Sequence, residues 1–146
     1  MKKYLLIVSL AVLLCICGCD SSDSTDVSDQ ERLQGNWSGF EVGRDSDNCT
    51  LTISENTMDF KGPTAQEWYK ATFTLDESVN PKTGDITITD CPAPDYVGKV
   101  GMIIYKIEGS TLTIAGSEPG QPVRPSSFDG AGETRVFVLT KVVPAE

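Results

Sequence analysis

Apolar and polar residues alternate along most of this chain after Leu33, with the period of two that is typical of β-strands. The segment 49–54, for example, places Leu51 and Ile53 on one face and threonines on the other. The alternation predicts eight strands, over residues 35–42, 49–54, 57–61, 68–75, 85–89, 100–107, 111–115 and 134–142.

Most of these strands are joined by short connections rich in turn-forming residues, which favours an all-β antiparallel meander. Because closing eight strands into a barrel removes exposed strand edges, we expect a single eight-stranded barrel. A two-sheet sandwich with one core fits the same alternation. No stretch keeps a helical period for three turns, so helix is expected only as a turn within 30–33 or 64–67.

The N-terminus has the features of an export signal. Lys2 and Lys3 are followed by an apolar run over 4–16 and then by Gly18 and Cys19. This order resembles the bacterial lipoprotein signal, in which the chain is cut before a cysteine that carries lipid, here Cys19. The alternative is a retained membrane helix, but the run is shorter than the roughly 20 residues that a span requires.

The sequence therefore divides into three parts. Residues 1–18 are expected to be a signal peptide, and residues 19–32 a lipidated cysteine followed by a flexible tether. The tether prediction depends on 20–29, which contains mostly serine and aspartate and has too little apolar surface to fold. Residues 33–146 are expected to form one domain.

Composition narrows the range of functions. Without Lys2 and Lys3 the mature chain has ten basic residues against 21 acidic ones, a net charge of −11. Such a surface repels nucleic acid and anionic lipid, so we expect the membrane to be reached only through the lipid anchor. Histidine is absent, which removes the commonest general base and metal ligand. We expect no enzymatic activity, no metal and no cofactor.

Several motifs occur in an order that is similar to a known family. They are LQGNW at 33–37, TFTLDESVNPKTGDITI at 72–88, IIYKIEGSTLTI at 103–114 and RPSSF at 124–128. Over 33–142 the chain closely resembles a small lipocalin-like domain of planctomycete bacteria. The resemblance implies an eight-stranded lipocalin-like barrel, often in exported proteins, with no established activity. It also implies a basic residue of the last strand, Lys141, stacked on Trp37 of the first.

Large side chains at inward positions are candidates for lining a ligand cavity, because eight strands leave room for one small molecule. The alternative is that these side chains simply fill the core. The candidates are Trp37, Met58, Phe60, Tyr69, Phe73 and Tyr105.

A proline-rich loop at 116–132 is a candidate cover for the barrel mouth. In that arrangement Phe128 plugs the barrel end and Arg124 pairs with a carboxylate of a ligand or of the protein itself. The alternative for Arg124 is a structural brace of the loop.

Cys49 and Cys91 are the cysteines that remain after export, and an oxidising compartment favours a disulfide between them. Two intervening strands separate them in a regular meander, so the bond requires the loop at 91–94 to fold inward. The alternative is two buried thiols.

Two functional hypotheses follow. The first is a non-enzymatic lipoprotein of the cell envelope, facing the periplasm or the cell exterior, whose barrel binds a small apolar molecule. The second is a packed barrel that serves as a structural or interaction module for an envelope protein.

Overall fold

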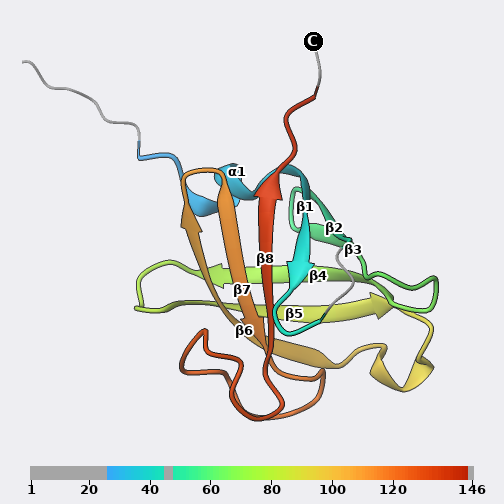
Figure 1. Cartoon of the computed structure of the whole chain (residues 1–146). Helices are drawn as coiled ribbons and strands as arrows, with labels where there is room; N and C mark the ends of the chain where they lie inside the picture. The colour runs from blue at the N-terminus through green and yellow to red at the C-terminus, as the bar shows by residue number, and fades with distance from the viewer. Residues whose placement is uncertain (1–25, 45–47, 145–146) are drawn as a thin grey trace, which may run out of the picture.

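The computed structural model describes residues 26–44 and 48–144 and confirms an all-β, lipocalin-like barrel (Figure 1). The short helices are α1 (Asp29–Leu33) and the 3₁₀-helix η1 (Pro94–Tyr96). The strands are β1 (Gly35–Glu41), β2 (Cys49–Ser54), β3 (Thr57–Lys61), β4 (Trp68–Asp76), β5 (Lys82–Asp90), β6 (Val100–Glu108), β7 (Thr111–Gly116) and β8 (Arg135–Lys141). The helical turn expected at 30–33 is present as part of α1.

Each strand pairs antiparallel with the next, and β8 pairs with β1, so the sheet closes on itself. The alternation of apolar and polar residues fitted both a barrel and a sandwich, and the closed sheet shows that the fold is a barrel. In this topology α1 and the β2–β3, β4–β5 and β6–β7 turns lie at one end, while the other four connections lie at the opposite end (Figure 1). We call these the closed end and the mouth.

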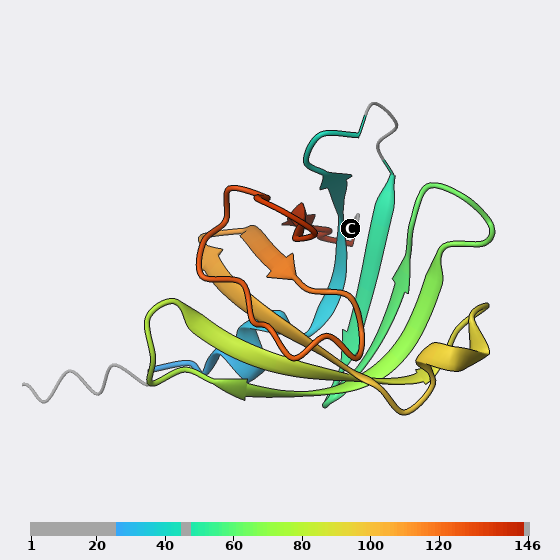
Figure 2. The same ribbon diagram turned by 90° about the horizontal axis from the view of Figure 1, so that it is seen from below.

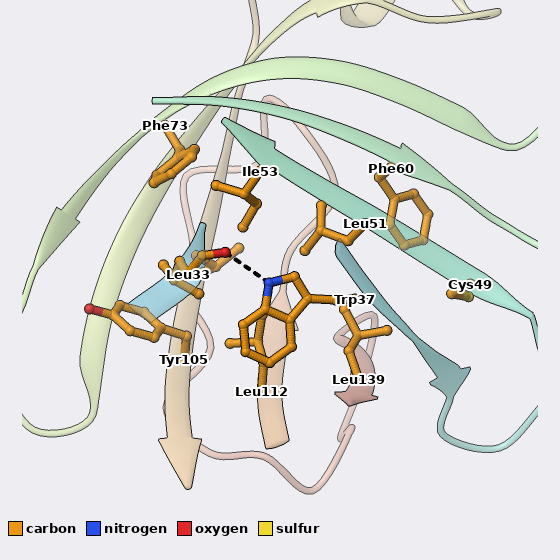
Figure 3. Packing of buried hydrophobic residues seen from close by; sticks show 11 residues of the cluster. Leu33, Trp37, Cys49, Leu51, Ile53, Phe60, Phe73, Tyr105, Leu112 and Leu139 are labelled. Atoms are coloured by element: carbon orange, nitrogen blue, oxygen red, sulfur yellow. Dashed lines mark hydrogen bonds between the residues drawn. The ribbon is translucent and has the colours of Figure 1, made fainter. Parts of the chain in front are cut away.

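The core at the closed end is densely packed around Trp37, which is only 1% exposed (Figure 3). Its indole Nε1 donates a 2.8 Å hydrogen bond to the carbonyl of Leu33, the last residue of α1. Lys141 lies beside Trp37 in the β1–β8 register, with Nζ 5.3 Å from the ring centroid, as predicted. The helix is thereby fixed over this end of the barrel.

The folded domain begins earlier than the sequence indicated, because α1 includes residues that were expected to belong to the tether. Ser28 caps the helix by accepting from the backbone N–H of Glu31. Asp29 is 2% exposed and accepts hydrogen bonds from Lys82 and Tyr105. The serine- and acid-rich composition of this segment indicates disorder. Composition does not reveal that the carboxylate of Asp29 is bound by a lysine and a tyrosine far along the chain, Lys82 and Tyr105.

The long β7–β8 connection packs against the outside of the barrel, seen near the viewer in Figure 2. Phe128 contacts the outward side chains of Ile104, Ala115 and Val136, so the expectation that it plugs the barrel end is wrong. These outward residues are apolar, and Phe128 covers them from solvent. Arg124 donates to the carbonyls of Gly84 and Ile103 and pairs with Asp85, as a brace does.

The expected disulfide is wrong, since Cys49 and Cys91 are both buried free thiols. Cys49 belongs to the main core, whereas Cys91 packs in a separate cluster with Ala71 and Ile88. Strands β3 and β4 separate β2 from β5, and three steps of about 4.8 Å exceed the roughly 7 Å that a disulfide spans. The loop after Cys91 does not cross the mouth: it forms η1, and the Cys91 thiol donates to the carbonyl of Ala93 at 3.0 Å.

A β-bulge explains why Cys91 is buried. Ala71 pairs with Ile88 but Lys70 pairs with Asp90, so Thr89 is an extra residue in β5. The bulge leaves Thr89 and Asp90 exposed and returns Cys91 to the inward face. The bend at 89–90 that an inward Cys91 requires is therefore present, although the bond is not.

The described residues include no helix with the length and apolar character needed to cross a bilayer. The signal peptide expected at 1–18 and the lipid-bearing Cys19 lie outside the described residues.

Candidate functional site

A cavity of about 320 Å³ occupies the barrel between the packed core and the mouth. Its walls are mainly apolar side chains of the strands, including Leu51, Ile86, Ile103 and Ile114. The barrel interior is packed at the closed end and hollow toward the mouth, so it combines a rigid base with room for a small ligand.

Three of the six lining candidates predicted from the sequence, Met58, Phe60 and Tyr69, lie in the cavity wall. Phe73 and Tyr105 line a second space of only about 30 Å³ nearer the closed end, which is too small for an organic ligand. Trp37 borders neither space and belongs to the core. The two interpretations of these side chains, a ligand cavity and a filled core, thus apply to different ends of one barrel.

Two glycines help to keep the cavity open. Gly101 faces inward on β6, opposite Ile86, and Gly116 ends β7 opposite Ile103; both glycines line the cavity. A Cβ built on Gly101 makes only ordinary van der Waals contacts, the nearest with the Ser117 carbonyl oxygen at 3.6 Å, so a side chain can start there without a clash. Sequence reasoning missed both residues because a glycine on an inward face carries no apolar signal.

The mouth is bordered by polar residues from two loops. Tyr96 of η1 and Glu118, at the start of the β7–β8 connection, meet there, and the tyrosine hydroxyl donates to the carboxylate. Glu133, at the end of the same connection, also lines the cavity, and both glutamates are exposed to solvent. The cavity therefore opens to solvent through an acidic rim.

Arg135 is the basic residue of the lining. Its Nε and Nη2 donate to the two carboxylate oxygens of Glu41, at 2.8 Å and 2.7 Å, which is a bidentate pair. The guanidinium carbon also lies 5.1 Å from the ring centroid of Phe137. In strand β8, Arg135, Phe137, Leu139 and Lys141 share the inward parity, a signal present in the sequence but not used there.

The ion pair continues into a small network. Arg44 lies 3.2 Å from Glu41 and 2.8 Å from Glu67. The network therefore contains two cations, Arg44 and Arg135, and two anions, Glu41 and Glu67, whose charges balance. The hydrogen bonds from Arg135 hold the pKa of Glu41 below its usual range; burial opposes them, and the charges of Arg135 and Arg44 add to the lowering. Glu41 is therefore ionised at neutral pH, and most of the charge on Arg135 is neutralised.

The site can enclose an apolar molecule and present a polar boundary to it. Within the described ranges, no group of three or more metal-ligating side chains lies close enough together to hold an ion. Comparison of the chain with protein-family models, with curated proteins and with solved structures returns no match.

Proposed function

We propose that the barrel binds a small apolar molecule in the cavity behind the mouth. The cavity is the observation that carries this proposal, because its volume of about 320 Å³ lies within the roughly 300–1,000 Å³ of small-molecule sites. An apolar cavity of about 150 Å³ accommodates benzene, so this one, which also opens at the mouth, suits a molecule of roughly two to three rings. The alternative of a packed interaction module requires a barrel that is filled to both ends.

The direction of the mouth supports a role at a membrane surface. The chain enters the domain at Ser28 and α1, on the closed end, so the mouth lies at the other end of the barrel (Figure 1). With Cys19 as a lipid anchor and residues 20–28 as the tether, the chain is attached at the end of the barrel opposite the mouth, which leaves the mouth accessible. We propose a lipoprotein of the cell envelope, related to the lipocalin-like planctomycete domains, that takes its ligand from the aqueous side. Loss of membrane fractionation in Cys19→Ser tests the anchor.

A cavity-filling variant tests binding. The protein is the unlipidated mature chain, residues 19–146 with Cys19→Ser, which keeps every described residue. Gly101→Leu adds a side chain at the cavity wall, where the new Cβ makes ordinary contacts of 3.6 Å or more. We expect the affinity for the neutral dye N-phenyl-1-naphthylamine to fall by at least roughly tenfold. Fluorescence titration measures it.

The matched control is Met102→Leu, a volume-conserving change at the adjacent, outward residue of β6. It should bind the dye as the parent chain does, and both variants should keep a cooperative unfolding transition. Equal affinity in Gly101→Leu and Met102→Leu, or no dye binding by the parent chain, contradicts the proposed function.

A further inference from the structure

We propose that the cavity prefers a cationic amphiphile, with an apolar body and one positively charged head, over a neutral or anionic molecule of the same shape. This inference rests on the proposed function and adds the chemical class of the ligand. The cavity provides the site for the body, and the charges of the mouth decide which head is accepted.

The charge at the mouth is negative. Glu118 and Glu133 contribute two carboxylates to the lining, and Arg135 contributes one guanidinium. Because Arg135 is held bidentately by Glu41, its charge is already matched inside the wall. Among the described residues, an entering head group therefore meets two rim carboxylates, and Lys99, which lies against Tyr96 outside the lining, can balance at most one of them.

The aromatic part of the lining favours the same sign. Tyr96 stands at the rim beside Glu118, and Phe60, Tyr69 and Phe137 follow deeper in the barrel. The face of an aromatic ring attracts cations, most strongly where water is excluded. The Nζ of Lys99, which is not part of the lining, lies 5.7 Å from the Tyr96 ring centroid. A ring at the rim thus already contacts a cation on this protein.

An anionic head faces the opposite situation. It must pass the two exposed glutamates, and it must compete with Glu41 for Arg135, whose Nε and Nη2 are both engaged. Exposed carboxylates are partly screened by solvent, so the preference should be modest: about three- to tenfold for the cation over the neutral molecule at low salt. Added salt should reduce it.

Three probes with one apolar body, a phenyl ring carrying four methylene groups, test the inference: 4-phenylbutylammonium, 4-phenylbutanol and 5-phenylpentanoate. Their affinities for the unlipidated mature chain are measured by isothermal titration calorimetry at low and high salt. We expect the order cation, alcohol, anion, with the spread smaller at high salt. An alcohol that binds as tightly as the cation overturns the inference. So does an anion that binds most tightly, which identifies Arg135 as the head-group partner instead.

A charge-neutralised variant separates the contribution of the rim carboxylates to affinity from the contribution of the apolar cavity. Glu118→Gln with Glu133→Gln should remove most of the preference for the cation, because it should lower the affinity for phenylbutylammonium much more than the affinity for phenylbutanol; the amide oxygen at 118 still offers Tyr96 an acceptor. The matched control is Glu108→Gln, an exposed glutamate at the closed end that pairs with Lys106. A preference that survives in the double variant overturns the inference. Absence of phenylbutanol binding to the parent chain contradicts the proposed function itself.

Discussion

Asp29 should be a major contributor to the stability of the domain, although it lies in a segment whose composition indicates a tether. Its carboxylate is 2% exposed and accepts from the Tyr105 hydroxyl at 3.1 Å, from Arg32 at 3.1 Å and from Lys82. Asp29→Ala removes all three interactions together. Because the interactions with Lys82 and Tyr105 join α1 to β5 and β6, their loss should loosen the packing of α1 over the closed end.

The magnitude follows from the exposure of each partner. Tyr105 is 2% exposed, so its orphaned hydroxyl costs about 1–3 kcal/mol. The side chains of Lys82 and Arg32 are 37% and 36% exposed and regain water, so each pair contributes about 0–1 kcal/mol. Together these contributions predict that Asp29→Ala lowers the free energy of unfolding by about 1–5 kcal/mol. For a domain of this size the melting temperature should fall by roughly 10 °C.

The effect should depend on pH. Burial by itself raises the pKa of Asp29, but hydrogen bonds from Lys82 and Tyr105 and the charges of Lys82 and Arg32 outweigh burial, so the folded-state pKa lies below 3.8. A lowered folded pKa stabilises the domain above the unfolded value and loses that contribution as pH falls through the folded value. The stability gap between the parent chain and Asp29→Asn should therefore be full at neutral pH and shrink below about pH 4.

Urea unfolding followed by circular dichroism measures these differences in the unlipidated mature chain. A double-mutant cycle with Tyr105→Phe should give a coupling energy of about 1–3 kcal/mol, since the hydrogen bond is buried and charge-assisted. The control is Glu31→Ala, an exposed acidic residue of the same helix whose carboxylate accepts from the Ser28 hydroxyl at 3.4 Å; it should lower stability by no more than about 1 kcal/mol. If Asp29→Ala behaves like Glu31→Ala, or if the coupling is zero, α1 does not hold the barrel as described.

Two further predictions concern the mouth and the cysteines. Glu41→Gln should lower the free energy of unfolding by about 1–3 kcal/mol at neutral pH, because Arg135 loses a bidentate carboxylate; the loss should diminish in acid, since the pKa of Glu41 is lowered in the folded state. An equal loss at every pH, by urea unfolding, argues against the charge-assisted pair. Cys49 and Cys91 should both be alkylated once the protein is denatured without reductant, giving two labels by mass spectrometry. In the native protein Cys49 should be alkylated slowly, because burial and the nearby Glu41 raise the pKa of its thiol. No label on the denatured chain contradicts the free thiols.

The sequence by itself determined the class of the fold. Strict alternation, as in Leu51 and Ile53, specifies which face of each strand is buried, and short turns leave a meander as the simplest pairing. Even the contact of Lys141 with Trp37 followed from a resemblance carried by the sequence and was confirmed. These features are local or depend on neighbouring strands, so a linear pattern is sufficient to reveal them.

Only the tertiary structure decided where the barrel is hollow. A cavity is the difference between the space enclosed by the strands and the side-chain volume placed in it, and that difference depends on residues as distant as Gly101 and Phe60. The same limit applies to Asp29, whose partners are 53 and 76 positions away, and to Cys91, whose direction depends on one bulge residue. Alternation identifies what points inward, but only closure of the sheet determines what each inward group meets.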